Sequence, residues 1–154
     1  MLAERLTPGV HVEADTLQKM IISGRVWITR PREPEGEAHR QLRLRLKNSC
    51  LLARSFLDAG FNVVLDDIII GARYQHLLED LAGTPFTLVV LAPRPDVVAT
   101  KRDPGRSWPA LGEEWSRYLD EELRKTMAGI GLWFDTSDQT PEETVEEIFR
   151  RLSD

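Results

Sequence analysis

The alternation of short apolar runs with long amphipathic segments most constrains what this chain can fold into. Four runs are rich in Val, Leu, Ile and Phe, at residues 9–15, 61–67, 86–93 and 131–137. All but the first are nearly continuous apolar stretches, which are typical of strands buried on both faces of a parallel sheet. Segments 37–60, 72–82 and 113–127, and the segment from Pro141 onward, carry apolar residues at spacings of three and four, the pattern of amphipathic helices. Strands that alternate with helices predict right-handed crossovers and a doubly wound α/β sheet.

Two of the predicted helices have clear end signals. The helix over 37–60 stops at Gly60, and its apolar stripe consists of Leu42, Leu46, Cys50, Ala53 and Leu57. The last helix has Thr140 as its cap, Pro141 at its first position and Glu143 placed to reach back to the cap. The stripe predicts that Cys50 is a small core residue.

Basic residues crowd one part of the 37–60 helix, in "HRQLRLRLK" over residues 39–47. Four cations stand there, Arg40, Arg43, Arg45 and Lys47. On a helix they spread over the outer face, so a solvated surface is the expected arrangement, ahead of an anion site.

Composition narrows the class of protein. A length of 154 residues with 42% hydrophobic residues suits one compact domain over residues 1–154. The net charge of -5 lacks the basic excess of a nucleic-acid-binding protein, so we expect no nucleic-acid partner. A single cysteine cannot form an internal disulfide and fits a reducing compartment. The first residues lack a secretory pattern and no apolar run approaches the ~18 residues of a membrane span, so we expect a cytoplasmic protein without membrane contact.

Polar residues follow the predicted strands at their carboxyl ends, where parallel sheets bind ligands. They are Glu13 and Asp15, Asp66 and Asp67, Arg94, and then Asp135, Thr136 and Ser137. A helix cap or a solvated loop explains any one of these acids alone. Three of the four strands end in acid, however, and P-loop enzymes use carboxylates delivered in this way to hold Mg²⁺ directly or through water.

Four stretches together resemble P-loop kinases of the chloramphenicol phosphotransferase-like and zeta-toxin-like group. They are "HVEADTLQKMIISGR", "AGFNVVLDDII", "LVVLAPRPDVVATKRDPGR" and "GLWFDTSDQTPEETVEEI", which look like that group's second to fifth strands with the segments that follow them. The resemblance runs from Met1 to the final helix and depends on the order and spacing of the four. It implies a three-layer α/β/α parallel sheet and an ATP-dependent phosphotransferase that acts on a hydroxyl of a small molecule.

The resemblance also implies roles for the acids. In the family, an acid just after the second strand is the base that takes the proton from the substrate hydroxyl, and Asp15 falls on that position. Asp67, or its neighbour Asp66, falls on the acid of the metal site. ATP and Mg²⁺ are the cofactors implied.

The remaining implied site residues belong to the lid and the nucleotide site. Arg102 and Arg106 fall in the lid, about residues 101–112, whose arginines neutralise charge on the transferred phosphoryl group. Thr136 and Ser137, after the fifth strand, are expected on the cofactor side of the site. The lid and residues 17–36 choose the substrate in this group, and neither carries a pattern that names it.

One part of the family pattern is absent from the sequence. None of the ten glycines is followed by lysine, so G-x-x-x-x-G-K-[ST], the loop that holds the phosphates, does not occur. "MLAERL" looks like the tail of the helix after that loop. The first strand of the family lies between the third and the fourth, so its loss leaves unpaired interior edges, unless the neighbours close up or another chain fills the gap by self-association.

Two functional classes stay open. The first is a small-molecule kinase, whose upstream reading frame we expect to encode, within about 15–25 residues, an apolar strand and the phosphate-binding motif. The second is a non-catalytic remnant of the fold that acts as a binding or assembly protein. The retained acids and lid arginines favour the kinase, whereas the missing loop favours the remnant and predicts no ATP binding by the 154 residues alone.

Overall fold

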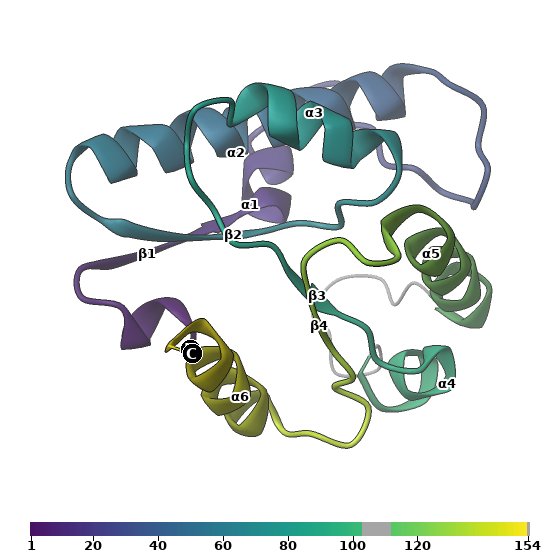
Figure 1. Cartoon of the computed structure of the whole chain (residues 1–154). Helices are drawn as coiled ribbons and strands as arrows, with labels where there is room; N and C mark the ends of the chain where they lie inside the picture. Colours follow the sequence, from purple (N-terminus) through teal and green to yellow (C-terminus); the bar gives the residue numbers. More distant parts are fainter. Residues whose placement is uncertain (103–111, 154) are drawn as a thin grey trace. The chain divides into compact units, whose positions relative to one another are not determined.

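The computed structural model describes residues 1–102 and 112–153 (Figure 1). The chain falls into two compact units, Met1–Pro85 and Phe86–Asp154. Each unit contains one pair of parallel strands together with helices, so the predicted α/β class is confirmed.

The first unit is built around the strands β1 and β2. Its elements are η1 (Ala3–Arg5), β1 (Gly9–Glu13), α1 (Ala14–Lys19), α2 (Glu37–Asp58), β2 (Asn62–Asp66) and α3 (Ala72–Asp80). The strands pair in parallel, from Gly9 opposite Asn62 to Glu13 opposite Asp66. Helix α2 packs against both strands, α1 and α3, and Figure 1 shows α2 and α3 along the same side of the strand pair.

The core of the first unit lies between α2, α3 and the strands. Four buried residues form it, Leu46 and Cys50 from α2 with Leu77 and Leu81 from α3 and the turn after it. Leu65 of β2, with Ile69 and Tyr74, packs against this cluster. The predicted core position of Cys50 is therefore confirmed.

Strand β2 is less buried than its apolar run predicts. Leu65 faces the core, but Val64 points to the other side of the pair, and both are only partly buried. On that side Val64 is paired with His11 of β1, which is exposed. Within this unit, β2 is therefore only partly buried along its length, less than its apolar run predicts.

Two glycines are required by the backbone of the first unit. A Cβ at Gly9 would lie 2.0 Å from the carbonyl oxygen of Ala3 and 2.4 Å from that of Leu6, so η1 can fold back on β1 only if residue 9 has no side chain. Gly60 has φ 87° just after the end of α2, so the predicted helix stop is confirmed.

The second unit has a parallel strand pair of its own. Its elements are β3 (Val89–Leu91), α4 (Pro95–Val97), the π-helical segment η2 (Val98–Arg102), α5 (Gly112–Met127), β4 (Leu132–Phe134) and α6 (Pro141–Ser153). Val89 pairs with Leu132, and Leu91 with Phe134. The guanidinium of Arg151, on α6, lies 5.5 Å from the ring centroid of Phe134, so this helix reaches the end of β4.

The start of α6 follows the sequence prediction closely. The backbone N–H of Glu143 donates to Thr140 Oγ1 at 3.1 Å, and the N–H of Thr140 donates to Glu143 Oε2 at 2.7 Å. This reciprocal pair is the predicted capping box, with Pro141 as the first helical residue. No helix in the described part of the chain is both long and apolar enough to cross a membrane.

Candidate functional site

Acidic side chains gather at the carboxyl edge of the β1–β2 pair, as the sequence predicts. Asp15 lies in the first turn of α1, which begins directly after β1. Asp67 follows β2 directly. Because Glu13 is opposite Asp66 in the strand register, the two acids leave neighbouring strands at the same edge.

Arg45, from the middle of α2, connects the two acids. Its Nη1 donates to Asp15 Oδ1 at 2.8 Å, and its Nη2 donates to Asp67 Oδ1. The Arg45 side chain is only 6% exposed, so this pairing takes place largely out of water. One guanidinium thus joins acids that follow two different strands.

Asp67 is the most enclosed acid of the site, with its side chain 1% exposed. Its Oδ1 also accepts the N–H of Ile68 at 2.8 Å, and its Oδ2 accepts Arg73 Nη2 at 2.5 Å. Burial raises the pKa of Asp67, and the positive charges of Arg73 and Arg45 oppose that rise. Burial likewise lowers the pKa of Arg73, against the effect of the Asp67 charge. Since both carboxylate oxygens accept N–H bonds, the ionised form fits this geometry.

Asp66 differs from its neighbour in exposure. Its side chain is 67% exposed, and its Oδ2 lies 3.6 Å from His11 Nε2. In the described arrangement, therefore, Asp66 is the acid of this pair that a solvent-borne ligand can reach, whereas arginines occupy both oxygens of Asp67. Within residues 1–102 and 112–153, no three acidic, histidine or cysteine side chains converge as a metal-binding group.

Asp15 has the geometry of a proton acceptor. Arg45 holds its Oδ1, while its Oδ2 has no hydrogen-bond partner among the described residues, and the side chain is 51% exposed. One oxygen is fixed and the other faces water. A carboxylate held in this way can orient and deprotonate a hydroxyl that approaches the edge of the sheet.

The prediction of a solvated basic face is wrong for Arg45, which is buried, whereas Arg40 and Lys47 are exposed and Arg43 is partly exposed. Arg40 is exposed and pairs with Glu37 on its own helix, as a surface residue does. Arg45 instead belongs to a buried polar row, together with Gln41 and Ser49. The sequence carries a signal for it, because these three residues recur every four positions and run alongside the apolar stripe.

The buried amide groups of Gln18 and Gln41 hold the segment that follows α1. Gln41 Oε1 accepts the N–H of Val26 at 2.8 Å, and Gln41 Nε2 donates to the carbonyl of Gly24 at 2.8 Å. Gln18 Nε2 donates to Val26 O and to Gln41 Oε1, both at 3.1 Å. These bonds fix the backbone of part of residues 17–36, the segment expected to choose the substrate, and sequence inspection did not predict them.

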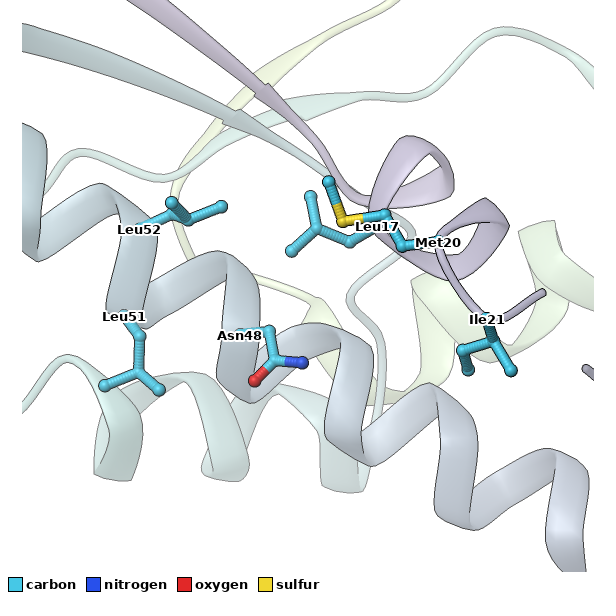
Figure 2. Close-up of a pocket in the computed structure, with 6 residues that line it drawn as sticks. All are labelled: Leu17, Met20, Ile21, Asn48, Leu51 and Leu52. Atoms are coloured by element: carbon cyan, nitrogen blue, oxygen red, sulfur yellow. The ribbon is translucent and has the colours of Figure 1, made fainter. Parts of the chain in front are cut away.

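An open groove of about 450 Å³ runs between α1 and α2 (Figure 2). It is lined by Leu17, Met20, Ile21, Asn48, Leu51 and Leu52. Five of these side chains are apolar, and Figure 2 shows the Asn48 amide on α2 between them. The groove therefore offers an apolar surface with one hydrogen-bonding group beside the segment expected to choose the substrate.

In the second unit, Thr136 and Ser137 are buried after β4. The backbone N–H of Arg94 donates to Ser137 Oγ at 2.9 Å, and the N–H of Ser137 donates to Asp135 Oδ1 at 3.0 Å. The hydrogen bonds from Ser137 lower the pKa of Asp135. The Ser137 hydroxyl thus ties the segment after β3 to the segment after β4, at the carboxyl edge of this strand pair.

The expected lid lies almost wholly outside the described residues. Arg102 is the last residue of η2. Arg106 lies outside the described residues, as does most of the segment 101–112.

Comparison of the chain with protein-family models and with curated proteins found no match to either.

Proposed function

We propose that the chain carries the acceptor-side half of an ATP-dependent phosphotransferase site, in which Asp15 receives the proton of a small-molecule hydroxyl. The observation that carries this proposal is the state of the Asp15 carboxylate, which is half-exposed directly after a parallel strand with one oxygen held by Arg45. Phosphoryl transfer needs mainly positioning, positive charge and a carboxylate that orients the attacking hydroxyl.

The strand pairing supports the kinase-type sheet of the family that the sequence resembles. In that sheet the first strand lies between the third and the fourth, so without the first strand the sheet is divided at that point. Here β1 pairs with β2 and β3 pairs with β4, as two separate two-stranded parallel sheets. A two-stranded parallel sheet is uncommon by itself, because parallel strands usually occur in larger sheets covered on both faces. A strand inserted between the pairs would give the three-layer α/β/α arrangement.

The fit to ATP and Mg²⁺ is incomplete within these 154 residues. The phosphate-binding motif does not occur in the sequence, and Asp67, the acid expected at the metal, has both oxygens bound by arginines. Asp66 is the acid that fits a metal-bound role better, since its carboxylate is exposed at the same edge. The proposed function therefore requires a phosphate-binding strand and loop in addition to residues 1–154. The chain's own contribution is the proton acceptor, with Arg102 and Arg106 proposed for the lid.

The same observations favour a second candidate, a non-catalytic member of the fold that binds or assembles with other molecules. An Asp67 carboxylate neutralised by Arg45 and Arg73 holds the edge of the sheet together without any ligand. In that case the apolar groove between α1 and α2 would be the more important surface.

Calorimetric titration of ATP·Mg²⁺ separates the two candidates. It is carried out on the 154-residue chain and on a chain extended at its N-terminus by the upstream reading frame. The kinase proposal expects no binding heat for the short chain at millimolar nucleotide, and binding by an extended chain that contains G-x-x-x-x-G-K-[ST]. An upstream frame with no such motif, together with no binding by either chain, would make the non-catalytic candidate the better one. Tight binding by the short chain would mean that residues 1–154 build a phosphate site of another kind.

A further inference from the structure

The guanidinium of Arg45 binds both acids, although this orientation leaves one of its own N–H groups without a hydrogen-bond partner among the described residues. Its two terminal nitrogens reach Asp15 and Asp67, while its Nε is buried and has no hydrogen-bond partner among the described residues. An unpaired buried N–H is unfavourable and rare in folded proteins. The side chain therefore adopts an orientation that connects the acids although one of its own donors stays unpaired.

A second arginine of the same helix shows what an ordinary ion pair in this unit looks like. Arg43 is partly exposed and uses both terminal nitrogens on one carboxylate, that of Asp80. Arg45 instead divides its terminal nitrogens between two carboxylates and is almost fully buried. Buried ion pairs are weak contributors to stability, because desolvation of the charges offsets their attraction. Stability alone therefore does not account for the placement of Arg45.

The arrangement has a direct effect on Asp15. Asp15 and Asp67 leave neighbouring strands at one edge, and two unscreened carboxylates there would repel each other. Arg45 lies between them, neutralises that repulsion and fixes Oδ1 of Asp15 while Oδ2 stays open to solvent. Gln18 and Gln41 make a further side-chain hydrogen bond between α1 and α2, and Gln41 also holds the backbone of Gly24 and Val26.

We propose that Arg45 is the positioning residue for the proton acceptor Asp15. By holding Oδ1 of Asp15, it leaves Oδ2 for the substrate hydroxyl. As a residue of α2, it also ties Asp15 to the helix whose Gln41 holds Gly24 and Val26, in the segment expected to choose the substrate. This inference rests on the proposed function for its catalytic meaning. The orientation of Asp15 by Arg45 can nevertheless be measured without any kinase activity.

Carbodiimide labelling of carboxylates tests the orientation on the 154-residue chain itself. Asp15 is half-exposed, and its labelling with a carbodiimide and glycinamide is quantified by peptide mass spectrometry. We expect Asp15 labelling to rise severalfold in Arg45→Ala and in Arg45→Lys, and to be unchanged in the matched control Arg43→Lys. Added methylguanidine should return the labelling of Arg45→Ala toward the wild-type level, because it can occupy the vacated guanidinium position.

Asp80 serves as the internal reference, since its side chain is only 12% exposed and it pairs with Arg43, which the Arg45 variants keep. If Asp80 labelling rises together with that of Asp15, Arg45 merely holds the fold together and the inference is wrong. Unchanged Asp15 labelling in a folded Arg45 variant overturns it equally.

The kinetic arm applies to an extended chain that binds ATP. There Arg45→Lys should lower kcat by roughly 10-fold to 100-fold while KM for ATP stays the same, the usual effect of losing a residue that supports a catalytic group. A variant that changes only KM for ATP would contradict the positioning role. Failure of ATP binding would count against the proposed function and leave the labelling result on Arg45 standing.

Discussion

At the scale of single residues, the Asp15 carboxylate has one oxygen bound by Arg45, and its side chain is half-exposed. In an extended chain that binds ATP, Asp15→Asn should reduce turnover by roughly 10²–10⁴ with little change in ATP affinity, because a positioned proton acceptor contributes about that much. Turnover is measured as ADP release over a panel of small hydroxyl compounds. Asp80→Asn is the matched control, since Asp80 also pairs with an arginine of α2. Wild-type turnover in Asp15→Asn would leave Asp15 as an ordinary first-turn residue of α1.

Cys50 gives a residue-scale prediction about pH. Burial raises the pKa of its thiol to about 11 from the usual 9.0. A raised pKa in the folded state adds stability at low pH, and this contribution is lost as the pH rises from about 9 through about 11, because only the unfolded thiol ionises there. Urea midpoints measured over this range should therefore fall more for the wild type than for Cys50→Ala. If the urea midpoint fell equally with pH in the two proteins, Cys50 would not stay neutral in the folded chain.

At the scale of elements, helix α2 packs against α1, α3 and both strands of its unit. Its buried face combines apolar residues with the polar row of Gln41, Arg45 and Ser49. Gln41→Leu removes its two bonds to the backbone of the exposed residues Gly24 and Val26, so we expect a loss of about 1–3 kcal/mol in unfolding free energy, at about 0.5–1.5 kcal/mol for each bond. Hydrogen exchange at the Val26 amide should become faster. Ser49→Ala, which removes only a bond within α2, should leave Val26 exchange unchanged.

The helices are the part of the fold that the sequence predicts best. Apolar periodicity and local end signals specify them, as the Thr140 capping box and the Gly60 stop show. The carboxyl-edge acids were also predictable, because strand order along the chain fixes which residues come after each strand. The partner of those acids was harder to predict, because the four-residue spacing of Gln41, Arg45 and Ser49 indicates a polar row beside the apolar stripe but does not say which carboxylates the row faces. That choice depends on how α2 packs against α1 and β2, which no local pattern encodes.

At the scale of the whole molecule, the two separate strand pairs are the feature on which the proposed kinase-type sheet depends. Each pair is parallel and two-stranded, so each of the four strands has one edge without a partner strand among the described residues, and a strand between the pairs would fill those of β2 and β3. Unpaired backbone groups at a strand edge are templates for another strand. A strand from the upstream reading frame and a strand from a second copy of the chain would both satisfy them, and they lead to different behaviour in solution.

The final prediction concerns which strand completes the sheet. If the upstream frame supplies it, extension should protect from hydrogen exchange those amides of β2 and β3 that point away from β1 and β4, because the family's first strand pairs with both neighbours. The amides of β1 and β4 are the internal control for the exchange measurement. The extended chain should also stay monomeric in light scattering at all concentrations. A dimer of the 154-residue chain that forms with rising concentration and protects the same edges would assign them to self-association. Extension that leaves both edges exchanging as before would contradict a strand between the two pairs, and with it the kinase-type sheet.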